Sequence, residues 1–490
     1  MDSSGAAQER TAAQAGWHVS RYIVTAPIPN TKKTALFNTY TRRCGECTPI
    51  ELYIMDVLDE VPETHPIVQH LAKRGAIVNY DEREAFELKR KLDCTTAHGG
   101  TVHVTICPTL ACNFECPYCF ATHRAGKMSA TIQDDVVEMA GRMLDASLAK
   151  KLEITWFGGE PLMATDVIES LSPKLIQVAE ERGCEYHAWI FTNDYLLTEE
   201  VVDLLRRCQV TNVHIPLDGI GATNDATRRL VGGGPTYDRI IENLGLPKPP
   251  TKTPIRANTH DGNVGQTDEL KQAVLGRAEE AGTMLHLYAA SIVDVSRADE
   301  TNSAMAEYAF HGIEVELRPE ARHLIVGKDH ACVGQNLWRV AVDDQGPLYK
   351  CGGKLCGQPE YAFGSAHDWD PSAPIESASN PDMIAKFLNT TVVSHDDKCY
   401  ECKWLPMCEG GCPQLRLFGK PECPPYRFDP ERFVLAMHSR LKKDQNLTWH
   451  KDRWGPRQSG TPSLKRPPEK RPGAAPKCRP LIRLVWVRKL

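Results

Sequence analysis

The chain has 490 residues, of which 41% are hydrophobic and 25% are charged, and its formal net charge is −5 at pH 7. This length predicts two or three domains, and the nearly balanced charge excludes a global basic field for nucleic acid. No apolar run is long enough to span a membrane and the N-terminus lacks the features of a signal peptide, so we expect a cytoplasmic protein with no nucleic-acid or membrane partner.

The first hundred residues predict a disordered start followed by a small α/β module. Residues 1–16 are polar and alanine-rich, and we expect them to be disordered. The module covers residues 17–95 and mixes extended segments with helical runs. The extended segments are expected at 20–25, 34–40 and 76–79, and the helices near 50–60 and 65–74.

Short apolar strands and amphipathic helices alternate between residues 100 and 310. Strands are expected near 101–106, 152–157, 187–191, 211–217, 254–259 and 284–290. Helices are expected near 130–149, 165–182, 198–207, 236–244 and 267–281. Such alternation predicts a parallel sheet covered by helices. Six units are too few for an eight-stranded barrel, so the predicted fold is α/β with a partial (β/α)6 TIM-like barrel, whose chemistry lies at the C-terminal strand ends.

The C-terminal third divides into a cysteine-rich region and a tail. The cysteine-rich region runs from 330 to 425 and is expected to form a domain of its own. The tail, residues 445–490, is basic and proline-rich, and we expect it to be disordered.

Three cysteines follow the first strand of the barrel in the sequence C-N-F-E-C-P-Y-C-F, residues 112–120. A [4Fe–4S] cluster normally takes four thiolates. The spacing C-x3-C-x2-C supplies three, from Cys112, Cys116 and Cys119, and leaves one iron open to a substrate or cofactor. Zinc sites more often use C-x2–4-C pairs and disulfides are disfavoured in a reducing compartment, so an iron–sulfur site is favoured over structural zinc.

The spacing of these cysteines, with Phe120 directly after the third, resembles the motif of the radical S-adenosylmethionine (SAM) superfamily. The resemblance implies the partial barrel fold predicted above. It also implies that the three cysteines are the catalytic residues, because they hold the [4Fe–4S] cluster whose open iron binds SAM.

Motifs at the ends of later strands resemble the SAM-binding positions of the same superfamily. Residues 158–160 form its G-G-E motif, in which glycines allow close backbone approach and the carboxylate engages the amino group of SAM. The third strand ends in a Thr-Asn pair followed by Asp194 where glycine is usual, and the fourth ends with Pro216 where serine is common. The cofactor-binding residues implied by the resemblance are Phe120, Gly158, Gly159, Glu160, Thr192, Asn193, Arg256 and Asn258.

Seven further cysteines match the pattern C-x9–15-G-x4-C, then C-x2-C-x5-C-x3-C, then a last cysteine. This pattern resembles the SPASM domain, which implies two auxiliary [4Fe–4S] clusters and three clusters in all. The implied ligands of the first auxiliary cluster are Cys332, Cys351 and Cys412, and those of the second are Cys399, Cys402, Cys408 and Cys423. Cys356 is the nearest candidate for a fourth ligand of the first auxiliary cluster, which otherwise has an open iron.

The resemblance implies an oxidoreductase in which an external electron donor, such as flavodoxin or ferredoxin, supplies the electron that cleaves SAM. A 5′-deoxyadenosyl radical then abstracts hydrogen from a peptide or small protein substrate. SPASM proteins mostly modify peptides, so we expect a ribosomal peptide maturase that forms a thioether or another cross-link. The module at 17–95 resembles the leader-recognition domains of such enzymes, although a structural cap over the barrel fits equally well.

Three alternatives stay open from the sequence. Within the same superfamily, a sulfatase-maturing enzyme would oxidise Cys or Ser to formylglycine. A non-catalytic iron–sulfur electron carrier or sensor would need neither the open iron nor the G-G-E motif. A structural zinc protein would account for some of the cysteines but not for all ten in their two ordered sets.

Overall fold

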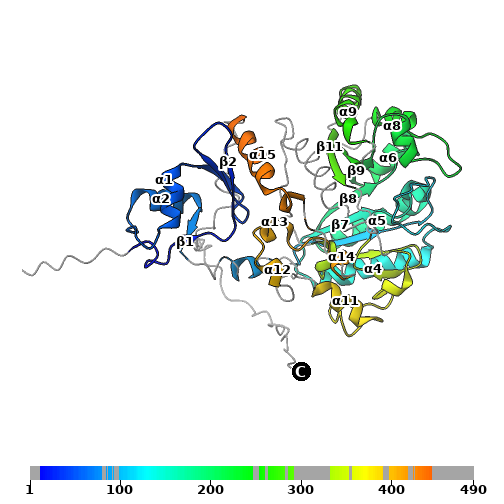
Figure 1. Cartoon of the computed structure of the whole chain (residues 1–490). Coiled ribbons are helices and arrows are strands. Elements are labelled where there is room, and N and C mark those ends of the chain that lie inside the picture. Colours follow the sequence, from blue (N-terminus) through cyan, green and yellow to red (C-terminus); the bar gives the residue numbers. More distant parts are fainter. Residues whose placement is uncertain are drawn as a thin grey trace, which may run out of the picture. The chain divides into compact units, whose positions relative to one another are not determined.

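A nine-stranded sheet organises the centre of the chain (Figure 1). The computed structural model describes residues 11–79, 84, 86–90, 92, 99–246, 253–259, 263–281, 285–291, 332–352, 356–389, 397–417, 423 and 425–443. The order across the sheet is β11-β10-β9-β8-β7-β6-β12-β13-β14. The edge strands of this order, β11 and β14, are not neighbours of each other. The sheet formed by the described residues is therefore open, as expected for a partial barrel.

Six strands of this sheet are parallel and lie side by side in the order of the sequence. They are β6 (Val102–Ile106), β7 (Lys151–Trp156), β8 (Glu185–Phe191), β9 (Val210–Pro216), β10 (Thr253–Thr259) and β11 (Leu285–Ser291). The helices between them are α4 (Ala130–Ala146), α5 (Thr165–Glu181), α6 (Glu199–Arg207), α7 (Ala222–Thr227), α8 (Tyr237–Leu244) and α9 (Thr267–Ala281). The six predicted strands and the five predicted helices are therefore confirmed, and the short α7 is one element that the prediction lacks.

The alternation of side chains along β6 separates a core face from a cavity face. Val102, Val104 and Ile106 are fully buried in the main hydrophobic core, which they share with residues of α4 and α5. The intervening His103 and Thr105 point to the opposite face, since successive residues of a strand alternate, and they line a cavity there. Along β6, the side chains on the cavity face are thus polar and those on the core face are apolar.

The cysteine-rich region contributes three strands to the same sheet. They are β12 (Arg339–Val342), β13 (Pro347–Tyr349) and β14 (Gly364–Ser365). β12 pairs in parallel with β6, and β13 and β14 continue antiparallel. Residues 339–365 of the region predicted as a cysteine-rich domain therefore extend the barrel sheet and cover the edge of β6. The extent of that domain stays a prediction.

The N-terminal module has an antiparallel three-stranded sheet, two helices and a small two-stranded pair. Its elements are β1 (His18–Val19), β2 (Ile23–Pro27), β3 (Thr34–Asn38), β4 (Arg43–Cys47), α1 (Pro49–Asp56), α2 (Pro66–Arg74) and β5 (Ile77–Val78). The predicted extended segments and helices are present, and β1 and β4 are additions. The role of the module in leader binding or capping stays a prediction.

The predicted disordered start is wrong for its last residues. The Ala12 N–H donates to the Val61 carbonyl at 2.6 Å, and Ala12 is fully buried. Residues 1–10 and the tail 445–490 lie outside the described residues.

Short helices lie among the C-terminal cysteines, and a longer helix follows them. They are α11 (Pro381–Leu388), α12 (Asp397–Tyr400), α13 (Leu405–Cys408), α14 (Pro413–Leu417) and α15 (Pro430–Lys443). Phe433 and Val434 of α15 share a buried cluster with Val24 and Phe37 of the N-terminal sheet. In the described part of the chain, no helix has the length and apolar character that a membrane span requires.

Two leucines near the start of β7 offer a test of the core. Leu152 is fully buried, and Leu148 is 91% exposed. We expect Leu152→Ala to lower the free energy of unfolding by about 2–5 kcal/mol, because it leaves a cavity in the core. Leu148→Ala should change it by about 0.5 kcal/mol or less. Denaturant titration followed by circular dichroism checks both; equal midpoints would contradict the assigned core face.

Candidate active site

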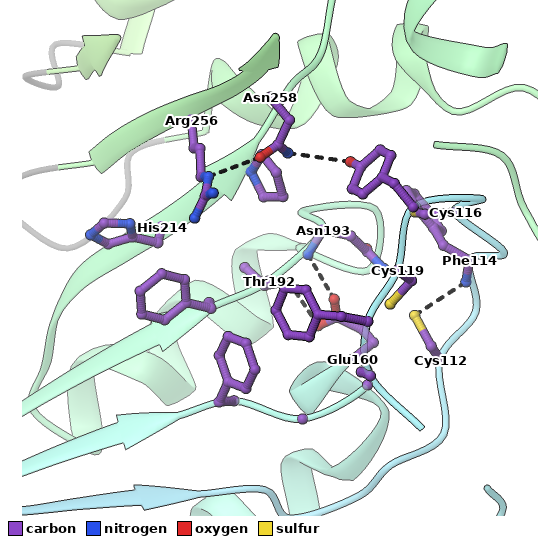
Figure 2. A pocket seen from close by; sticks show the side chains of 18 of the residues that line it. Cys112, Phe114, Cys116, Cys119, Glu160, Thr192, Asn193, His214, Arg256 and Asn258 are labelled. Atoms are coloured by element: carbon purple, nitrogen blue, oxygen red, sulfur yellow. Dashed lines mark hydrogen bonds between the residues drawn. The ribbon is translucent and has the colours of Figure 1, made fainter. Parts of the chain in front are cut away.

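The C-terminal ends of the parallel strands open into a cavity of about 440 Å³ (Figure 2). All residues predicted to hold the first cluster and SAM line this cavity, although they lie far apart in the sequence. They are Cys112, Cys116, Cys119, Phe120, Gly158, Gly159, Glu160, Thr192, Asn193, Arg256 and Asn258. The convergence follows from the parallel sheet, whose strands all end at the same edge.

The three thiols lie on an irregular loop after β6 whose path is set by backbone hydrogen bonds. The Phe114 N–H donates to Cys112 Sγ at 3.4 Å, and the Cys119 N–H donates to the Cys116 carbonyl at 3.0 Å. Two further backbone bonds of 2.9 Å tie the loop to the segment 229–231. Burial raises the pKa of Cys112 to about 12, so a bound cation is needed to favour its thiolate at neutral pH.

The two glycines of the G-G-E motif pack against the segment that leads into the cysteine loop. A Cβ on Gly158, whose φ is +122°, would lie 2.3 Å from the Thr109 carbonyl oxygen, and one on Gly159 would lie 2.2 Å from that of Ala111. The sequence predicts that these glycines make room for SAM. In the structure, the space beside their α-carbons is filled by the chain's own backbone, so they are required for the position of the cysteine loop.

Glu160 places a buried carboxylate on the wall beside the thiols (Figure 2). Its Oε1 accepts from Thr192 Oγ1 at 2.7 Å and from the Leu162 N–H at 2.9 Å, and its Oε2 accepts from the Asn193 N–H at 2.7 Å. Burial raises the pKa of Glu160, although these hydrogen bonds and the charge of Arg228 act in the opposite direction. No cation of the described residues forms an ion pair with it within 4.0 Å, so the carboxylate is available to a cationic group of a ligand.

The opposite wall of the cavity carries a hydrogen-bonded polar network. Arg256 Nε donates to Asn258 Oδ1 at 2.9 Å, and Asn258 Nδ2 donates to Asp218 Oδ1 at 2.9 Å and to the Tyr118 hydroxyl at 3.3 Å. The Tyr118 hydroxyl in turn donates to Asp218 and accepts from Arg228 Nη1 at 2.9 Å. The network joins the cysteine loop to β10.

Tyr118, Asp218 and Arg228 are absent from the predicted site. A signal existed for two of them, because Tyr118 lies inside the cysteine motif and Asp218 ends a predicted strand. Arg228 follows the short α7, and no pattern in the sequence marks it. It is buried and contacts the Phe114 ring at 5.5 Å.

The two departures from the superfamily motifs have different structural settings. Asp194 has a φ of +66°, in the left-handed region where glycine is favoured and aspartate is tolerated. It is fully buried and does not line the cavity. Pro216 does line the cavity, as the last residue of β9.

A second cavity of about 350 Å³ adjoins the first. The three cysteines predicted for the first auxiliary cluster, Cys332, Cys351 and Cys412, all line it. The residues that line both cavities are Phe157, Phe191, Cys351, Cys412 and Gln414. The structure therefore brings this second set of thiols next to the first site.

The four remaining cysteines of the predicted set lie near one another on and after α12 and α13. Burial, together with the neighbouring Cys402, Cys399 and Cys423 thiols, raises the pKa of Cys408 to about 11. Arg427 Nη1 donates to Cys423 Sγ at 2.6 Å. This mutual effect of four thiols on one another fits a shared ligand.

The donor sets fit iron–sulfur clusters in their chemistry. Two of them place three thiols on the wall of a cavity, and the third gathers four thiols. Each thiolate of a cubane binds a different iron, so such thiols surround a volume. Among the described residues, no group of three or more His, Cys, Asp and Glu side chains is arranged around one metal ion.

Comparison with known proteins supports the assignment of the barrel. Residues 106–246 match the family model described as "Radical SAM superfamily". The chain is 31% identical over 138 residues to Fe-coproporphyrin III synthase of Methanosarcina barkeri, covering 28% of this chain and 31% of that protein. It is 26% identical over 152 residues to 7,8-dihydro-6-hydroxymethylpterin dimethyltransferase of Methanocaldococcus jannaschii, covering 31% and 29%. The matched segments thus span about three tenths of the length of these relatives.

A solved structure has the same fold over a longer range. "Native anSMEcpe with bound AdoMet and Cp18Cys peptide" superposes with a TM-score of 0.54 at 18% identity, covering 71% of this chain and 99% of that chain. The likeness concerns the fold. Residues 106–246 are thus similar to the radical SAM superfamily, and a longer stretch of the chain shares the fold of this solved structure.

Proposed function

We propose that this protein is a radical SAM enzyme that modifies a peptide or small protein. One observation carries the proposal: three cysteine thiols and the buried Glu160 carboxylate line the same cavity at the C-terminal end of a parallel sheet. The thiols suit an iron–sulfur cluster, and the carboxylate suits the ammonium group of SAM. A protein that only carries electrons does not need this carboxylate beside its cluster.

In this proposal, Cys112, Cys116 and Cys119 hold the cluster. Glu160, fixed by its three hydrogen bonds, orients the amino group of SAM, and Arg256 with Asn258 holds its carboxylate and ribose. The cluster and SAM, when bound, supply an organic radical that removes hydrogen from an unactivated carbon. The surrounding residues exclude water and hold SAM in one orientation.

The second and third cysteine sets are proposed as ligands of two auxiliary clusters. Cys332, Cys351 and Cys412 lie at the cavity that adjoins the first, so a cluster there would be close to a substrate held over the first site. The set of Cys399, Cys402, Cys408 and Cys423 would hold the other. An external donor such as flavodoxin or ferredoxin is proposed to supply electrons.

A peptide substrate is supported by two observations. The similar anSMEcpe structure contains a bound Cp18Cys peptide together with AdoMet. In this chain, the two adjoining cavities provide a continuous lining next to the predicted radical site. The modification proposed is a thioether or another cross-link in a ribosomally made peptide.

The cysteine loop can be tested by removing its thiols. We expect the triple variant Cys112→Ala, Cys116→Ala, Cys119→Ala to lose about four irons per chain and to release no 5′-deoxyadenosine with SAM and dithionite. Cys184→Ala is the matched control, because Cys184 lies outside both cavities. This variant should keep its iron and still release 5′-deoxyadenosine. Undiminished release by the triple variant would refute the assignment.

Glu160 can be tested by a change that removes only its charge. We expect Glu160→Gln to weaken SAM binding about tenfold or more, because a charge-assisted hydrogen bond is lost. Burial raises the pKa of Glu160, so SAM affinity of the parent should fall as the pH is lowered, and the variant should lack this dependence. Glu115→Gln, on the exposed side of the loop, is the control. Equal affinities by calorimetry would count against the role.

The set on α12 and α13 can be tested separately. We expect Cys408→Ala to lose about four irons per chain while still releasing 5′-deoxyadenosine, because its thiol lines neither cavity. Cys208→Ala, a buried cysteine of the barrel core, should retain all iron. Loss of SAM cleavage in a folded Cys408→Ala protein would show that this set belongs to the first site.

A further inference from the structure

The second cavity has two chemically different walls. Cys332, Cys351 and Cys412 supply three thiols to it. The other side is built by residues of the barrel strands, His103 and Thr105 of β6, Glu153 and Thr155 of β7, and Trp189 and Phe191 of β8. If the thiols hold a cubane, its fourth iron needs a further ligand or stays open.

The Cys356 thiol is engaged outside the second cavity. The residue is 2% exposed and belongs to a buried cluster with Cys107 and Tyr349, against which Cys351 also packs. Its thiol interacts with that of Cys107, and this hydrogen bond is the largest cause of its raised pKa. Cys356 is not among the residues that line the second cavity.

On the strand wall, the buried side chain of His103 has one ring nitrogen, Nδ1, without a hydrogen-bond partner. The residue is 8% exposed, and its Nε2 lies 2.8 Å from Thr155 Oγ1. Its Nδ1 is buried and has no hydrogen-bond partner, and Glu153 Oε1 lies 3.9 Å from it. Leaving a buried polar group unsatisfied costs free energy, and an ion that binds there is one of the explanations for such a group.

The two charged side chains on these walls are already engaged. Lys350 Nζ donates to the carbonyls of Asn336 and Arg339, both at 2.6 Å, and an ammonium group has no lone pair for a metal. Glu153 Oε2 accepts from Lys151 Nζ at 2.7 Å. These contacts leave the imidazole as the better ligand.

The environment of His103 also selects the form that binds a metal. When Nε2–H donates to the Thr155 hydroxyl, Nδ1 carries the free lone pair. Burial lowers the pKa of His103 to about 4, so the ring is neutral at pH 7. A hydrogen bond from the other ring nitrogen is the usual support of a ligating histidine.

The register of the sheet brings this histidine to the cysteine-rich region. His103 is paired with Arg339 of β12, and the His103 N–H donates to the Trp338 carbonyl at 2.9 Å. The charge of Cys332 acts on both Arg339 and Lys350. His103 and Cys332 are therefore both close to Arg339, and both line the second cavity.

We infer that His103, through Nδ1, is the fourth protein ligand of the cluster proposed for Cys332, Cys351 and Cys412. The inference rests on the proposed function, since it requires that cluster. It gives the first auxiliary cluster a Cys3His ligand set and no open iron. Replacing a thiolate by a neutral imidazole removes one negative charge and raises the reduction potential, as histidine ligands do in other iron–sulfur centres.

The test uses the full chain with Cys112, Cys116 and Cys119 replaced by Ala, so that only auxiliary clusters remain. After anaerobic reconstitution and reduction, pulsed EPR measures nitrogen coupled to the clusters, with ¹⁵N-histidine labelling to identify its source. We expect about eight irons per chain and a strong coupling from a directly bound histidine. Adding His103→Ala or His103→Cys should abolish the coupling.

Two controls separate ligation from structural damage. His103→Cys offers a thiolate in place of the imidazole, so it should keep about eight irons while the nitrogen coupling is lost. His214→Ala changes another histidine of the concave face, which lies against the Phe191 ring at 4.3 Å and lines only the first cavity. It should leave the coupling unchanged.

The outcomes distinguish this inference from the proposed function. About eight irons without a histidine coupling would overturn the role of His103 and leave the auxiliary clusters standing. A histidine nitrogen coupling that persists in the His103→Cys variant would also overturn the role of His103 without refuting the auxiliary clusters. A chain without iron after loss of the first three cysteines would refute the auxiliary clusters themselves, and the inference with them.

Discussion

The site depends on a close contact between two backbone segments. Residues 158–159 and residues 109–111 approach so closely that a methyl group on either glycine would collide with a carbonyl oxygen. The Glu160 N–H then donates to the Ala111 carbonyl at 2.8 Å. Because the cysteine loop starts at the next residue, the contact places the thiols and the Glu160 carboxylate at one end of the cavity.

The barrel could be predicted from the sequence because the pattern of each strand and helix agrees with the packing of the whole sheet. Each strand is a short apolar run, each helix is amphipathic, and a parallel sheet is the arrangement that covers both faces. The cavity residues followed from the same logic, since Glu160, Thr192 and Asn258 all stand at or just beyond the carboxyl ends of strands.

The parts that could not be predicted are those that depend on contacts distant in the chain. The pairing of β12 with β6 joins residues more than two hundred positions apart, and neither strand carries a pattern that names its partner. The role of Arg228 likewise appears only when the fold brings it to Tyr118. Asp194 is a departure from the glycine usual at that position, and only the backbone angle shows why that glycine is usual.

The β6–β12 ladder fixes how far apart the first two groups of thiols lie. The Cys107 N–H extends this ladder to the Val342 carbonyl at 2.9 Å, just before the cysteine loop begins on one side and the β13 turn on the other. A slip of one residue would shift the two segments by about 3.3 Å. If the proposed clusters are bound, the register of the sheet therefore sets the distance that an electron would cross between them.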